Sequence, residues 1–263
     1  MPIYMTKDDL GEPTALSFHA AGDSGRLTQD IQRLAEVWGI PATNSHVGRR
    51  DWLRAWQNIT VLANRIFDTL GAQEQCDPET FHHLLLAVGN FKRQAGVIHL
   101  PVELADSVAG SRRESLVLPS GLGRLERDSE ASWQRLRIIP GLGSIPTASC
   151  LLAALWPDSH AIMDVLDRRA AVGLRIGRRS RTDQRLDTAR IPGHEWWFYN
   201  WFRRTVTLTA EAADCDLVSV ERALYILGSR TAGELGTKWE LKGTWSDYCH
   251  AALRQVDRGG NLP

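Results

Sequence analysis

Residues 139–172 read IPGLGSIPTASCLLAALWPDSHAIMDVLDRRAAV, and this stretch decides the interpretation of the fold. Its turn, Pro140 to Gly143, separates two apolar runs that are compatible with helices. The run from Ser129 to Ile139 is expected to end at Pro140, because proline cannot continue a helix. The second run, residues 146–156, is expected to end at the proline that follows it. The sequence therefore predicts two helices joined by a tight hairpin.

The predicted hairpin is chemically suited to hold an anion. Gly141 and Gly143 let a ligand approach the backbone closely and permit a positive φ angle in the turn. The second helix adds unpaired N–H groups at its start and the positive end of its dipole. Such a contact holds a phosphate without reading any base, so it would position a protein on a nucleic acid.

Asp164 follows the hairpin by about twenty residues and begins another helical run, to about Val172. It is a favourable N-cap residue, and Asp167 stands where a capping-box acid would. An ionised carboxylate at this position could equally stabilise a developing positive charge and orient or deprotonate a water molecule. The start of a helix favours the ionised form. From the residues alone, capping and catalysis both remain open and do not exclude each other.

Helical patterns also dominate the rest of the chain, where apolar residues recur at helical spacing between glycine and proline stops. We expect further helices at residues 28–38, 51–70, 78–88, 194–213, 218–228 and 245–257. Three stretches lack such a pattern. Residues 1–25 are interpreted as a polar lead-in, 100–128 as short helices or turns, and 173–192 as an arginine-rich loop. No convincing β-strand alternation is found, so the predicted class is all-α.

Composition and charge are those of an ordinary globular protein. The 263 residues are 43% hydrophobic and 24% charged, and the formal net charge is zero. Neither a membrane-spanning apolar run nor a secretory signal is found, so we expect a cytoplasmic protein without membrane contact. Four cysteines lie far apart, outside any CxxC or Cys/His cluster: Cys76, Cys150, Cys215 and Cys249. We therefore expect no metal site and no cofactor.

The region from Val165 to Arg204 is distinguished by its charge. It holds ten arginines, no lysine and four acidic residues, which leaves an excess of six positive charges. These arginines could bind phosphates. The alternative is a compositional bias, because the whole chain has 27 arginines against 4 lysines.

A PGLG hairpin followed by an aspartate at this distance resembles the helix-hairpin-helix (HhH-GPD) DNA glycosylase superfamily, as a divergent bacterial member. The resemblance implies a two-lobed helical fold with the active site in an interlobe cleft. By this analogy residues 60–160 form the middle lobe, and residues 26–59 and 161–258 form the second lobe. The stretch from Ser144 to Ala148 is one residue longer than the usual hairpin pattern, so the hairpin register stays open.

The resemblance also implies a function and site residues. The protein would be a monofunctional DNA glycosylase, with Asp164 as the catalytic residue. The implied DNA-phosphate ligands are Gly141, Gly143, Ser144, Thr147, Arg168 and Arg169. Superfamily members that also cut the strand carry a lysine just inside the second hairpin helix, where Ile145 or Pro146 stands here. No lysine occurs between Lys92 and Lys238, so no lyase activity is expected.

The aromatic cluster from His194 to Phe202 is the candidate base pocket, because flipped bases stack on aromatic faces. Its candidates are Trp196, Trp197 and Tyr199, and for each of them the alternative is packing in the core.

The biological role stays open between repair of DNA damage and phage defence against hypermodified bases. Double-stranded DNA is the expected partner, and a monomer is expected. Two other functions remain open: a non-catalytic helix-hairpin-helix DNA-binding protein, and an all-α interaction protein whose turn is incidental.

Overall fold

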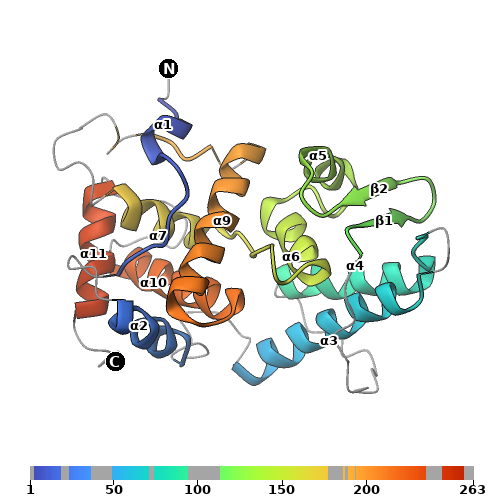
Figure 1. Ribbon diagram of the computed structural model, residues 1–263, viewed down its shortest axis with the longest axis horizontal. Coiled ribbons are helices and arrows are strands. Elements are labelled where there is room, and N and C mark those ends of the chain that lie inside the picture. The colour runs from blue at the N-terminus through green and yellow to red at the C-terminus, as the bar shows by residue number, and fades with distance from the viewer. Residues whose placement is uncertain are drawn as a thin grey trace. The chain divides into compact units, whose positions relative to one another are not determined.

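The computed structural model describes residues 3–18, 24–36, 49–70, 74–93, 113–176, 186, 189–192, 194–234 and 245–257. The chain forms two compact units (Figure 1). Unit 1 combines Met1–Trp38 with Met163–Pro263, and unit 2 is the contiguous segment Gly39–Ile162. The boundary expected between residues 59 and 60 is therefore corrected, because α3 (Arg49–Asp68) continues through that position as one helix of unit 2.

Unit 2 is built around a single buried helix. Its described elements are α3 (Arg49–Asp68), α4 (Pro78–Arg93), β1 (Ser115–Leu118), β2 (Gly123–Glu126), α5 (Glu130–Ile138) and α6 (Ile145–Leu155). α3 and α4 pack against each other, and both contact α6 (Figure 1). Almost every residue of α6 is buried, which explains why its sequence is apolar on all faces. The second arm of the predicted hairpin is therefore the central helix of this unit.

Residues 113–128 contain an antiparallel β-hairpin, so the expectation of short helices or turns is wrong for this part of 100–128. Leu116 pairs with Leu125 across the two strands. Leu116, Leu118 and Leu125 are buried while their strand neighbours are more exposed, which is the period-2 alternation of a strand. With four residues per strand, the pattern is too short to distinguish from a turn. Residues 100–112 lie outside the described residues.

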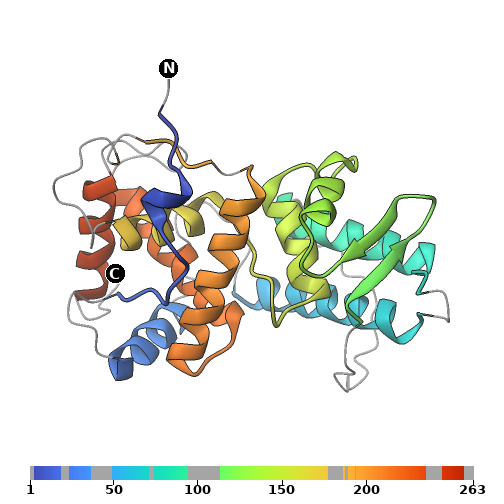
Figure 2. The ribbon, with the colours of Figure 1, turned by 45° about the horizontal axis from the view of Figure 1, so that its top comes forward.

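Unit 1 is a cluster of helices around α7. Its described elements are α1 (Lys7–Leu10), α2 (Ser24–Glu36), α7 (Val165–Ile176), α9 (Trp196–Ala213), α10 (Leu217–Glu234) and α11 (Trp245–Asp257). α10 and α11 pack against α7, and α2 and α9 pack against α10 (Figure 1 and Figure 2). The predicted all-α class is confirmed at this level, because the described chain is mostly helical with one small sheet.

Residues 3–18 are part of unit 1 and are irregular apart from α1, so this part of the expected polar lead-in is packed and does not form a free tail. Four of its apolar side chains are buried: Met5, Leu10, Leu16 and Phe18. Arg175, at the end of α7, holds the segment by donating hydrogen bonds to the backbone oxygens of Leu10 (2.9 Å) and Glu12 (2.6 Å) and to the hydroxyl of Thr14. The buried positions are too widely spaced to show a helical or strand pattern.

At Gly228, α10 lies against the backbone of α7, and Gly228→Ala is expected to destabilise the protein by about 1–3 kcal/mol. A Cβ at this position would lie 2.4 Å from the backbone oxygen of Leu166. This clash with backbone outweighs the gain of about 1 kcal/mol that alanine brings to a helix. Gly89→Ala in α4 is the matched control, because its Cβ would meet nothing within 4 Å. Thermal unfolding followed by circular dichroism tests the pair, and equal shifts in Tm would contradict the prediction.

Candidate functional site

The PGLG segment of unit 2 forms a tight turn between α5 and α6. α5 closes at Ile139, whose N–H donates to the oxygen of Leu136 (3.2 Å). Leu142 then folds back, donating its N–H to the oxygen of Ile139 (3.0 Å) and burying its side chain. Gly141 has a φ angle of +87°, a conformation that glycine adopts without strain. The predicted hairpin is confirmed, with a buried leucine anchoring an exposed glycine turn.

The start of α6 is defined by a side-chain cap. Ser144 is the N-cap, and its hydroxyl accepts a hydrogen bond from the N–H of Thr147 (3.3 Å). Gly143 runs close to α5, since a Cβ there would lie 3.0 Å from the backbone oxygen of Arg137. Pro146 lies in the first turn of α6, where it supplies no N–H donor.

Gly141, Gly143 and Ser144 are exposed at this turn and present backbone to solvent. Thr147 is different, because its side chain is buried and its N–H is already bonded to Ser144. The expectation that Thr147 binds a phosphate is therefore wrong. Ile145 beside Ser144 is buried, and Pro146 is half-buried.

Asp164 belongs to unit 1, where it precedes the first residue of α7. Its Oδ1 accepts a hydrogen bond from the N–H of Val165 (2.5 Å), and its own N–H donates to Oδ2 of Asp167 (2.9 Å). The Asp167 side chain thus supplies one half of a capping box, and the Asp164 side chain bonds only the N–H of the next residue. Asp167 is fully buried, whereas Asp164 is only half-buried. Of the two carboxylates, Asp164 is the one that remains accessible to a ligand.

Arg168 lies one helical turn after Asp164 on α7. Burial lowers the pKa of its guanidinium from the ordinary value, and the positive charge of Arg169 lowers it further, while Asp164 and Asp167 oppose both effects. Its buried Nε atom has no hydrogen-bond partner in the described part of the chain. The protein thus compensates the charge of Arg168 only in part, which favours binding of an anion.

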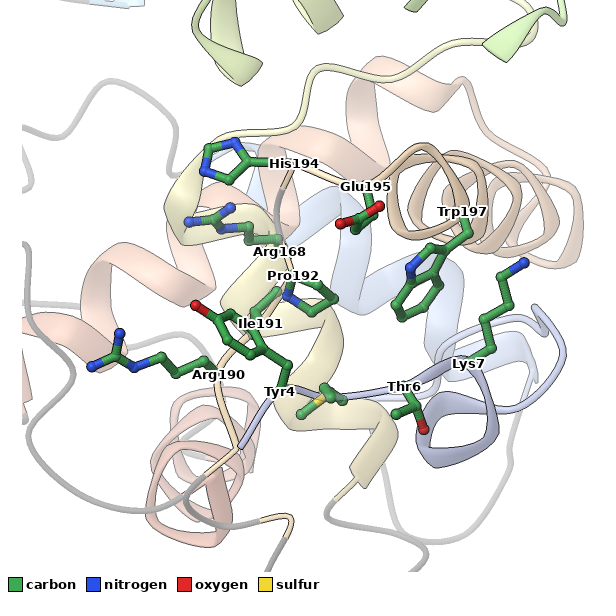
Figure 3. Close-up of a pocket in the computed structure, with 11 residues that line it drawn as sticks. Tyr4, Thr6, Lys7, Arg168, Arg190, Ile191, Pro192, His194, Glu195 and Trp197 are labelled. Carbon is green, nitrogen blue, oxygen red and sulfur yellow. The ribbon is translucent and has the colours of Figure 1, made fainter. Parts of the chain in front are cut away.

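Arg168 lines a pocket of about 640 Å³ in unit 1 (Figure 3). Trp197 lies in the same pocket, so two residues predicted for different purposes come together there. Further polar and aromatic lining residues were not predicted from the sequence: Tyr4, Lys7, Arg190, His194 and Glu195. Arg169, the second predicted arginine of α7, is half-buried and is not among the lining residues.

The pocket is assembled by pairing of two segments far apart in the chain. The N–H of Met5 donates to the oxygen of Arg190 (2.9 Å), and the N–H of Arg190 donates to the oxygen of Ile3 (2.8 Å). Trp245 fixes the neighbouring residue by donating its indole N–H to the oxygen of Ala189 (2.8 Å). No local sequence pattern predicts this pairing, so the pocket could not be predicted from the sequence.

The other two base-pocket candidates lie elsewhere on α9. Tyr199 is fully buried, so its ring has no face for a base and the expectation is wrong for this residue. Trp196 is half-buried, and its ring centroid lies 5.9 Å from that of Tyr199. The guanidinium carbon of Arg203 lies over the Trp196 ring, 5.7 Å from its centroid. The alternative of core packing is thus correct for Tyr199.

The described residues contain no group of three or more His, Cys, Asp or Glu side chains able to hold a metal ion, and all four cysteines are free. None of the described helices is both long enough and apolar enough to cross a membrane. Comparisons of the chain with models of protein families, with curated proteins and with solved structures found no match.

Proposed function

We propose that the protein is a monofunctional DNA glycosylase of the helix-hairpin-helix type, which flips a damaged or modified base out of duplex DNA and hydrolyses its bond to the sugar. The finer fold, a two-lobed arrangement with a cleft between the lobes, belongs to this proposal. So do its action as a monomer and its place in the cytoplasm, where bacterial DNA is found.

One observation carries the proposal: an exposed glycine turn between two helices, held in place by the buried side chain of Leu142. The described hydrogen bonds leave the backbone N–H groups of Gly141, Gly143 and Ser144 available to a ligand. Together with the positive end of the α6 dipole they suit a DNA phosphate. This contact would fix the position of the enzyme on the duplex and supply no base specificity.

Asp164 suits the chemical step that the proposal requires. As the C1′–N bond breaks, the base leaves with the bonding electrons and positive charge develops on the sugar. A half-exposed carboxylate beside that sugar would stabilise this charge and orient the water that attacks C1′. The water loses its proton, the base gains one, and an abasic site remains. No lysine stands at the hairpin to form a Schiff base, so the strand stays intact.

Gly141→Asp is expected to weaken duplex binding about tenfold or more, because a carboxylate would repel the phosphate held by the turn. The salt dependence of binding should fall by about one phosphate contact. Gly121→Asp is the matched control. Both glycines are exposed in unit 2, both have positive φ (+87° and +74°), and a Cβ on either meets nothing within 4 Å.

Fluorescence anisotropy with labelled duplex at several salt concentrations measures this difference. Equal loss of affinity in the two variants would reflect only strain and added charge, and it would count against the hairpin as the DNA contact.

A second function is favoured by a specific observation, the capping contacts of Asp164 with Val165 and Asp167. They give Asp164 a structural reason to be there, so the protein could bind DNA through the same hairpin without cutting any bond. Base release by the wild type and its loss in an Asp164 variant separate the two functions.

A further inference from the structure

The pocket of unit 1 carries more positive than negative charge. Arg168, Arg190 and Lys7 line it, against one lining carboxylate, Glu195. Lys7 and Arg190 are exposed, and no described carboxylate lies within ion-pair distance of either. Arg168 is the most buried of the three cations, and its charge is only partly compensated. A cavity with this balance attracts an anion.

The start of α9 adds to the positive potential of the pocket. Glu195, the N-cap of this 18-residue helix, makes no side-chain capping hydrogen bond, so the helix end is not closed by its own carboxylate. The positive end of the α9 dipole therefore faces the region lined by Glu195 and Trp197.

The walls of the pocket suit a flat ring. Trp197 and Tyr4 contribute aromatic surface, and Ile191 and Pro192 contribute apolar surface between them. In Figure 3 Trp197 lies on one side, Arg168, His194 and Arg190 lie toward the other, and Glu195 lies between the two groups. A ring against Trp197 could donate an N–H to the Glu195 carboxylate, and an anionic group on the same molecule would reach the arginines.

We propose that this pocket binds a nucleoside monophosphate, with its base against Trp197 and Glu195 and its phosphate at Arg168 and Arg190. The volume of about 640 Å³ lies within the usual range of small-molecule sites. The monophosphate has two sources, a free mononucleotide or one nucleotide of a single strand, and both present the same chemistry. This inference does not depend on the glycosylase proposal, because it requires binding and no bond cleavage.

The test is isothermal titration calorimetry of the full chain with the four 2′-deoxynucleoside 5′-monophosphates. Their phosphate-free nucleosides and inorganic phosphate are titrated separately. At least one monophosphate is expected to bind tenfold or more tightly than both its nucleoside and inorganic phosphate. A second arm uses a five-nucleotide single strand: competition with the mononucleotide identifies the strand as a source, and its absence identifies the free nucleotide.

Two variants locate the binding. Trp197→Leu should weaken monophosphate binding at least tenfold, and Trp196→Leu, on the same helix but outside the pocket lining, should leave it unchanged. Arg190→Gln should weaken binding severalfold and reduce its salt dependence, with the exposed Arg204→Gln as its control. Arg190 is exposed, so its variant remains informative where Trp197→Leu fails to fold.

Three results would overturn the inference: no binding of any monophosphate, nucleosides binding as tightly as their monophosphates, or pocket variants that bind like wild type. The hairpin variant Gly141→Asp should keep wild-type affinity for the mononucleotide, because no hairpin residue lines the pocket. Failure of this inference is thus distinguishable from failure of the glycosylase proposal.

Discussion

Asp164→Asn is expected to abolish release of the target base while leaving DNA binding intact. The substitution removes the negative charge that would stabilise the sugar cation, and loss of one such electrostatic contact typically slows a reaction about 10²–10³-fold. Asparagine keeps an oxygen that can accept the hydrogen bond from the N–H of Val165, so the start of α7 should survive. Base release is measured by counting abasic sites, and binding is measured on the same duplex.

Two controls separate chemistry from capping. Asp164→Ala removes both the charge and the cap, so it should lose activity and, in addition, about 0.5–2 kcal/mol of stability. Asp167→Asn alters a fully buried capping side chain and should lower stability more than it slows base release per folded molecule. An Asp164→Asn protein that is folded and still releases the base at the wild-type rate would remove Asp164 from the mechanism.

Trp156→Ala is expected to lower the free energy of unfolding by about 3–5 kcal/mol, the usual cost of truncating a buried tryptophan. Trp156 is fully buried at the end of α6 and donates its indole N–H to the oxygen of Arg113 (2.9 Å). The centroids of the Trp156 and Phe67 rings lie 6.1 Å apart in an edge-to-face arrangement. The substitution would therefore open a cavity and remove the hydrogen bond to the oxygen of Arg113, at the end of the helix that follows the PGLG turn.

Urea denaturation measures this loss, with Ile138→Ala as the control. Ile138 is 81% exposed on the neighbouring α5, so its truncation should change stability by about 0.5 kcal/mol or less. If Trp156→Ala lowers the free energy of unfolding as little as Ile138→Ala does, burial of Trp156 does not stabilise unit 2.

The features that the sequence predicts well are those encoded locally. Pro140 and Gly141 act through their own backbone, so the hairpin could be located to within a residue. The start of α7 after Asp164 follows from short-range capping in the same way. α7 runs through Gly173 to Ile176, past the expected end near residue 172, and the added turn buries Leu174 and Ile176.

The features that escaped prediction depend on contacts between distant segments. Residues 3–18 have the composition of a polar tail, but in the structure Arg175 donates hydrogen bonds to the backbone oxygens of Leu10 and Glu12. The pocket exists only because residue 5 pairs with residue 190. Neither contact leaves a spacing or composition signal in either segment.

The aromatic cluster illustrates a third limit, the choice of helix face. Trp197 and Tyr199 are two residues apart on α9, so they point in different directions: Trp197 lines the pocket and Tyr199 is fully buried. A run of aromatic residues on every face gives no apolar stripe from which the buried face could be chosen.

We propose that this protein removes a base from DNA. The most direct measurement is a count of abasic sites after incubating wild type and Asp164→Asn with a panel of duplexes that includes genomic DNA from phages with modified bases. We expect abasic sites from the wild type alone on at least one substrate, with the strand uncut, and that substrate would identify the target base. Wild-type protein that binds the duplexes but leaves no abasic site on any of them would contradict this proposal.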